Sequence, residues 1–340
     1  MKSYLANRTQ CVIVDQNLSK DVTLATGVPQ GSVLGPLLYT LYVAPLHDLI
    51  ISANMQTGIY ADDIQLFTSF HPDHCSDAIQ KIQNCIADVK SWAISNNLFI
   101  NDSKTEILHA TSQFKSTTIK SISVKMDQNT ITPSTHVKSL GVVLDPHLSM
   151  KQQLNAVCKS SYNAVRKISR IRKFLTNDIT TKLVCSLIMP RLDYCNSLLF
   201  GLPDSTLKKL QTVQNSAARL ISCSSRHDHI SPVLQSLHWL PVKQRSIYKL
   251  LLLTYKSQHS LAPGYITNLI PQYHPQRQLR SSTKCLLATS HTPNTKFYGE
   301  RAFISAAPHL WNNLPSSIRN APSVDCLKRL LKTHLFQNLQ

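Results

Sequence analysis

Residues 59–67 read Ile-Tyr-Ala-Asp-Asp-Ile-Gln-Leu-Phe, a pair of adjacent carboxylates between two apolar runs. Apolar residues lead into the pair, and the residues after it alternate between apolar and polar. This pattern predicts a β-hairpin with the carboxylates at its tip. Adjacent carboxylates on a tight turn suit hard divalent cations. The alternative is an acidic turn without chemistry, because Asp is a common turn residue.

A glycine loop precedes this stretch by about thirty positions and reads Gly-Val-Pro-Gln-Gly-Ser over residues 27–32. Such a loop can bring backbone close to a nucleotide. From Ser32 to about Ile51 apolar residues recur at helical spacing, which predicts a buried helix with Pro36 tolerated in its first turn. Residues 3–26 predict a hairpin with Asp15 in its turn.

Further elements follow from periodicity. An amphipathic helix is predicted over 76–96, then strand, loop and strand over 98–108 with Lys104 in the loop, then a β run over 137–145 that Gly141 interrupts. Beyond residue 150 the spacing predicts helices that begin near Leu154, Ile179 and Leu207, and others over 241–258 and 323–337. Residues 259–300 are rich in Pro, Ser, Thr, Gln and His and predict a loop or linker.

The charge is divided unevenly along the 340 residues. Residues 1–110 carry six Lys/Arg and ten Asp/Glu, a net charge of −4, and residues 111–340 carry thirty and eight, a net charge of +22. Such a basic excess indicates a polyanionic partner, because each neutralised phosphate releases counterions. The alternative is a basic surface that serves solubility alone.

The nine cysteines include no C-x-x-C pair, so neither a disulfide framework nor a four-cysteine zinc site is indicated. Cys223, His227, His229 and His238 lie close in sequence, but their spacing fits no zinc pattern and favours a polar loop. The N-terminal residues show no signal-peptide pattern, and no stretch of eighteen apolar residues lacks Pro, His or charge. We therefore expect an intracellular protein, nuclear or cytoplasmic, with no membrane partner.

Four motifs stand in a fixed order: the glycine loop extended to Pro36, Tyr60-Ala-Asp-Asp63, Asn101-Asp-Ser-Lys-Thr105 and Ser139-Leu-Gly-Val-Val-Leu-Asp145. In this order they resemble the reverse transcriptases of LINE-type, non-LTR retrotransposons, over about residues 27–145. The resemblance implies an α+β fold: a partial right-hand polymerase palm, which is an antiparallel sheet with helices on one face, then an all-α thumb-like and C-terminal region. The implied divisions are a palm at 1–148, a basic thumb-like or connection region at 149–258 and a C-terminal extension at 259–340.

The resemblance also implies site residues and partners. In that family two cations, Mg²⁺ or Mn²⁺, lie between palm carboxylates and join the primer end to a deoxynucleotide on an RNA template. By resemblance, the carboxylates that bind metal and catalyse are Asp62 and Asp63. The nucleotide and template would contact Gln30, Gly31, Tyr60, Ala61 and Lys104, and the primer grip would be Leu140 and Gly141.

One expected part of the site is missing from this pattern. The family places another metal-binding aspartate on a strand well before the glycine loop, whereas the candidates here are Asp15, a turn residue, and Asp21. We therefore expect a nucleotidyltransferase fragment that binds the metal weakly and is inactive alone. The alternatives are a non-catalytic, basic nucleic-acid-binding protein and a degenerate retrotransposon relic.

Overall fold

The computed structural model describes residues 2–28, 31–112, 122–127, 129–273, 285–289 and 298–338. The chain divides after Leu140 into two compact units, 1–140 and 141–340.

The N-terminal unit combines short antiparallel strands with two long helices. Its helices are α1 (Lys2–Leu5), α2 (Gly35–Ser52) and α3 (Cys75–Ser95), with 3₁₀ turns η1 (Pro72–His74) and η2 (Asp102–Lys104). Its strands are β1 (Arg8–Gln10), β2 (Ile13–Val14), β3 (Asn17–Leu18), β4 (Val22–Leu24), β5 (Gln56–Tyr60), β6 (Asp63–Phe67), β7 (Val124–Met126), β8 (Asn129–Ile131) and β9 (Val137–Ser139).

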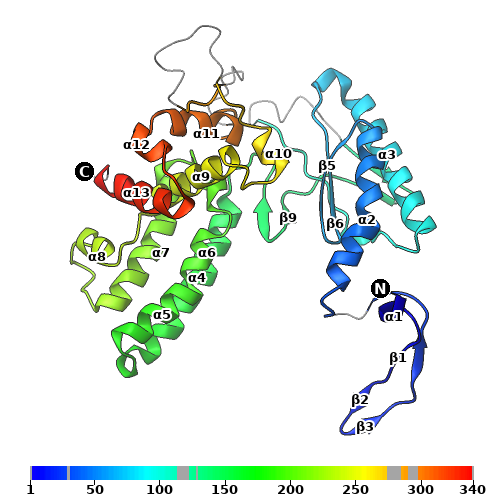
Figure 1. Cartoon of the computed structure of the whole chain (residues 1–340), viewed down its shortest axis with the longest axis horizontal. Helices are drawn as coiled ribbons and strands as arrows, with labels where there is room; N and C mark the ends of the chain where they lie inside the picture. The colour runs from blue at the N-terminus through cyan, green and yellow to red at the C-terminus, as the bar shows by residue number, and fades with distance from the viewer. Residues whose placement is uncertain are drawn as a thin grey trace. The chain divides into compact units, whose positions relative to one another are not determined.

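The core of this unit lies between α2, α3 and one face of the β5–β6 hairpin. Leu46 and Ile50 of α2 pack against Cys85 and Val89 of α3, and Ile59 of β5 joins them. Figure 1 shows α2 and α3 side by side next to β5. Because successive strand residues point to opposite faces, the hairpin turns Ile59 and Leu66 inward and leaves the other face in solvent.

Two predictions for this unit need correction. The helix α2 is not buried: only one stripe lies in the core, while Leu37 and Leu41 are more than half exposed. The strand, loop and strand predicted over 98–108 are replaced by the 3₁₀ turn η2 and a single parallel bridge from Ile107 to Pro133. Apolar spacing over so few residues does not separate a strand from an irregular segment that packs on a core.

The C-terminal unit begins with β10 (Val142–Leu144) and is otherwise helical. Its helices are α4 (Lys151–Ile171), α5 (Asn177–Leu187), α6 (Met189–Asp193), α7 (Asp204–Ser222), α8 (Ser231–Ser236), α9 (Val242–Gln258), α10 (Gly264–Thr267), α11 (Phe303–Asn312), α12 (Ser316–Arg319) and α13 (Val324–Gln337), with 3₁₀ turns η3 (Arg172–Phe174) and η4 (Asn196–Leu199). The predicted long helices are therefore confirmed.

This unit has two hydrophobic clusters. One joins α4, α5 and α7, and the other packs α9 against α11 and α13 around Tyr255 and Trp311. Buried polar bonds link α9 and the segment before it to α7 and η4. The Gln214 amide of α7 donates to the Leu240 carbonyl at 2.9 Å, and the Ser246 hydroxyl of α9 donates to the Asn196 carbonyl at 2.8 Å. Of the predicted linker over 259–300, residues 274–284 and 290–297 lie outside the described residues; in its first part, α10 is a short helix.

The described strands form five separate antiparallel pairs: β1–β4, β2–β3, β5–β6, β7–β8 and β9–β10. The coarse expectation of helices with small antiparallel strands is thus confirmed. Asp15 and Gln16 form the β2–β3 turn with positive φ angles, as predicted for Asp15. Over the residues described, no helix is both long and apolar enough to span a bilayer.

Candidate active site

The two aspartates lie where the sequence predicts them, at the tip of the β5–β6 hairpin. Tyr60 pairs with Asp63, so Ala61 and Asp62 make a two-residue turn. Ala61 has φ +52°, a left-handed conformation that is unusual outside Gly and Asn and that makes the tight reversal. Both aspartates are exposed. Four of the expected site residues, 60–63, are therefore brought together in one turn.

Tyr39 of α2 is a neighbour of this tip that the sequence analysis did not single out. Burial raises the pKa of its phenol, and the negative charge of Asp62 raises it further. The Tyr39 ring therefore lies within electrostatic reach of the Asp62 carboxylate. The sequence feature that pointed to Tyr39 was its position, about one turn into the helix that follows the glycine loop.

The glycine loop is tied to its surroundings at both ends. Arg8 donates to the Gly27 carbonyl at 2.7 Å, and the Ser32 hydroxyl accepts from the Gly35 amide at 3.2 Å, where α2 begins. Gly31 has φ +83° and no heavy atom within 4 Å of a Cβ built there, so its backbone is open to an approaching molecule. Gln30 lies outside the described residues.

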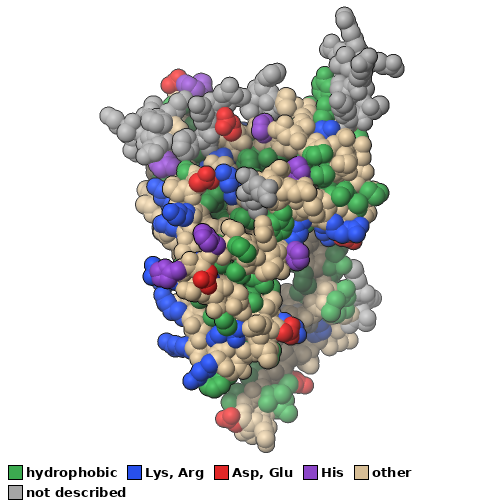
Figure 2. Space-filling model, turned by 90° about the vertical axis from the view of Figure 1, so that its left-hand side faces the viewer, with side chains coloured by type: hydrophobic (Ala, Val, Ile, Leu, Met, Phe, Trp, Pro, Cys, Tyr) green, Lys and Arg blue, Asp and Glu red, His purple; other side chains and the backbone are tan. Residues whose placement is uncertain are grey.

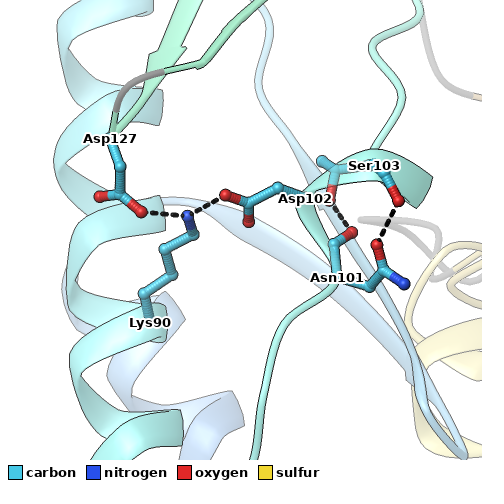
Figure 3. Close-up of polar contacts among 6 residues, drawn as sticks. Lys90, Asn101, Asp102, Ser103 and Asp127 are labelled. Carbon is cyan, nitrogen blue, oxygen red and sulfur yellow. Dashed lines mark hydrogen bonds and ion pairs between the residues drawn. The ribbon is translucent and has the colours of Figure 1, made fainter.

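Lys104 ends η2 and its side chain is exposed, with no salt bridge in the described part of the chain. The turn that carries it is held by another lysine. Lys90 of α3 bonds Asp102 at 2.7 Å and Asp127, beside β7, at 2.6 Å. Figure 3 shows the Lys90 ammonium group between the two carboxylates. Sequence reasoning missed this clamp, because its three residues come from separate segments.

The Lys90 side chain is only 13% exposed. Burial works against its charge, but the hydrogen bonds that it donates to Asp102 and Asp127 outweigh burial and raise its pKa above the usual lysine value. Asp102 is thus occupied by an ion pair that positions the turn before Lys104, and within this turn Ser103 donates to the Asn101 side chain at 2.6 Å.

Leu140 and Gly141 form the turn between β9 and β10, with φ +45° and +82°. The predicted β run over 137–145 is thus a hairpin that reverses at its glycine. The Gln65 amide of β6 donates to the Ser139 hydroxyl of β9 at 2.6 Å. This bond brings β9 to the outer face of the strand that begins with Asp63.

The hairpin tip offers two carboxylates to a metal ion in the part of the chain that the structure describes. Among the described residues, no three Asp, Glu, His or Cys side chains come together in a way that holds a metal ion, and Asp62 and Asp63 have no third partner of that kind. Cys223, His227, His229 and His238 likewise do not come together in such a group among the residues that the structure describes.

The region that carries this hairpin is similar to a known protein family. Residues 1–144 match the family model described as reverse transcriptase (RNA-dependent DNA polymerase). This region is therefore similar to reverse transcriptases, and the relatives below are polymerases of LINE-type, non-LTR elements. The family uses divalent metal ions and acts on nucleic acid and nucleotides.

The relatives name the type of element. The chain is 30% identical over 230 residues to the probable RNA-directed DNA polymerase from transposon X-element of Drosophila melanogaster, covering 65% of this chain and 24% of the relative. It is 27% identical over 237 residues to the probable RNA-directed DNA polymerase from transposon BS of Drosophila melanogaster, covering 65% of this chain and 25% of the relative. It is 26% identical over 232 residues to the RNA-directed DNA polymerase from mobile element jockey of Drosophila funebris, covering 65% of this chain and 24% of the relative. The chain thus spans about a quarter of the length of these relatives.

Proposed function

We propose that this chain supplies the palm and thumb-like part of a reverse transcriptase, with Asp62 and Asp63 as its catalytic and metal-binding carboxylates. The observation that carries the proposal is the Tyr60–Asp63 turn: two exposed, adjacent carboxylates at a hairpin tip, within the segment that matches the family. Carboxylates presented in this way suit Mg²⁺ or Mn²⁺ in nucleotidyl transfer.

The remaining site residues are assigned in the same proposal. Gly31, whose backbone is open, and Gln30 next to it contact the incoming deoxynucleotide and the template, together with Tyr60 and Ala61. Lys104, held in place through Lys90, faces the phosphates. Leu140 and Gly141 form the primer grip. The Gln65–Ser139 bond supports this last assignment, because it joins the strand before the grip to the carboxylate strand.

The basic C-terminal unit contributes affinity for the RNA template and the DNA primer. Its helix α4 lies in a segment, 146–177, with seven Lys/Arg and no Asp/Glu. Neutralising phosphates along such a helix adds affinity that does not depend on base sequence. The basic segment by itself favours the second candidate function, nucleic-acid binding without catalysis. The primer extension assay described next distinguishes the two functions.

Primer extension tests the catalytic part. The purified chain, given an RNA template, a DNA primer, deoxynucleotides and Mg²⁺ or Mn²⁺, should show no extension above background. The reason is that, among the described residues, no third metal-binding side chain joins Asp62 and Asp63. Fusing to the chain the preceding palm segment of the X-element polymerase should supply a further carboxylate and produce extension.

The control for this rescue is Asp62→Ala in the fusion, which should abolish extension. The matched change Asp73→Ala, at an exposed aspartate within η1, should leave extension unchanged. Extension by the unmodified chain that disappears in Asp62→Ala would show that its own residues complete the site. A fusion that extends primers equally well with and without Asp62 would refute the assignment of the carboxylates.

A further inference from the structure

The helix α4 carries a row of basic side chains on the side away from the hydrophobic core. Lys159, Arg166 and Arg170 are spaced by seven and four residues, and at about 100° per residue they fall within an arc of roughly 40°. The core residues Leu154, Ser161, Ala164 and Ile168 occupy the opposite face. On the face of the C-terminal unit drawn in Figure 2, Lys and Arg side chains gather along one margin, where Asp and Glu are few.

An exposed aromatic ring stands at the end of this row. Phe174, in η3, is 75% exposed, and the Lys173 ammonium nitrogen lies 4.8 Å from the centroid of its ring. Ile171 and Ile179, three and five residues away in the sequence, are each 45% exposed. A cation over one face of the ring leaves the other face open to a flat partner.

The turn that presents Phe174 is firmly anchored. Arg172 donates to the Leu220 and Ile221 carbonyls at the end of α7, at 2.8 and 3.2 Å, and to the Leu175 carbonyl at 2.7 Å. Leu175 packs on the core next to Phe174. An arginine at a helix C-terminus satisfies carbonyls that have no partner within the helix. Phe174 is therefore held outward by a fixed turn, so that ordering it on a ligand costs little further entropy.

We propose that Phe174 stacks on a base of single-stranded nucleic acid whose phosphates lie along the row Lys159, Arg166 and Arg170. Aromatic platforms beside basic grooves bind single strands in this way, because every base has a π face. This inference rests on the nucleic-acid part of the proposed function and assigns it a contact residue and a preference for unpaired bases.

A membrane surface would also attract basic and apolar groups, but the arrangement favours nucleic acid. An interfacial helix presents an apolar stripe along its length. Here the large exposed apolar side chains lie at the C-terminal end of the helix. Charge runs along its exposed side for about 17 Å, at 1.5 Å per residue over eleven residues.

Equilibrium binding of the full chain to a labelled dT20 strand and to a blunt 20-bp duplex tests this inference. Phe174→Ala should weaken dT20 binding about 5- to 100-fold and change duplex binding less than about twofold. The matched control is Phe99→Ala, because Phe99 is 90% exposed in the other unit. Phe174→Trp should keep the affinity, and its added indole fluorescence should be quenched by dT20.

Each outcome has a distinct meaning. Equal dT20 affinity for the wild type and Phe174→Ala overturns the stacking role while leaving nucleic-acid binding in place. An equal loss of affinity of Phe174→Ala for dT20 and for the duplex also overturns stacking, because such a loss reflects charge or folding alone. Absence of binding by the wild type to either probe refutes the nucleic-acid part of the proposed function as well. If Phe174→Ala loses binding to anionic phospholipid vesicles while its dT20 binding is unchanged, Phe174 would be assigned to a membrane contact.

Discussion

At the residue scale, the ion pair between Lys90 and Asp102 links α3 to η2. Lys90→Met should destabilise the N-terminal unit by about 2 kcal/mol, because Asp102, 23% exposed, would keep a mostly buried charge without its partner. Asp127→Asn should cost less than about 1 kcal/mol, since Asp127 is 71% exposed. Hydrogen exchange in peptides that cover residues 101–105 measures the loss of stability in both variants. Equal protection in the wild type and Lys90→Met would mean that the clamp is not what holds the turn.

His109 gives the same unit a dependence on pH. Burial lowers the pKa of its imidazole below the usual value, and the ring stacks on Phe70 with centroids 6.2 Å apart. The unfolded chain therefore takes up a proton at higher pH than the folded chain does, and stability falls as pH drops below about 6.5. Denaturant unfolding at pH 7.5 and 5.5 should show this loss, and His109→Gln should reduce it. A loss of the same size in the variant would assign it to other groups.

At the element scale, Asp145 sets the start of α4. Its carboxylate accepts hydrogen bonds from the backbone amides of His147, Ser149 and Met150 at 2.9–3.1 Å. These bonds hold a loop in which Leu148 and Met150 have positive φ angles, an unfavourable conformation for such side chains.

Asp145→Ala should therefore destabilise the C-terminal unit by about 2–4 kcal/mol, because three buried or half-buried amides lose their acceptor. Asp145→Asn, which keeps one acceptor oxygen, should cost less. Asp204→Ala is a matched control: Asp204 is 75% exposed and its ion pair with Lys243 is on the surface, so the cost should stay below about 1 kcal/mol. Urea denaturation ranks the three variants, and an Asp145→Ala cost no larger than that of Asp204→Ala would contradict this role.

At the scale of the whole molecule, charge should govern binding. Affinity for a single strand should fall steeply between about 50 and 400 mM salt, and the triple change of Lys159, Arg166 and Arg170 to Gln should reduce the log–log slope by about 2, at roughly 0.7 per phosphate. Lys243→Gln with Lys328→Gln removes two cations that pair with Asp204 and Asp325, so this control should alter the slope less. Asp62→Asn should bind as the wild type does. Fluorescence anisotropy measures all four, and a flat salt dependence would exclude the electrostatic account.

The sequence by itself determined the features whose pattern is local. The Asp62–Asp63 hairpin followed from alternation around a two-residue turn, and α3, α4, α7, α9 and α13 followed from apolar spacing, because a helix or hairpin repeats its pattern within a few residues.

Tertiary structure decided the features that depend on residues far apart in the chain. It determined that the strands form separate pairs, that α2 exposes Leu37 and Leu41, and that 98–108 is irregular. It also brought Lys90 to Asp102 and Asp127, and anchored Arg172 on the end of α7 so that Phe174 remains in solvent. The physical reason is that burial and ion pairing depend on which surfaces meet across long stretches of chain, whereas local periodicity specifies only which side of an element is apolar.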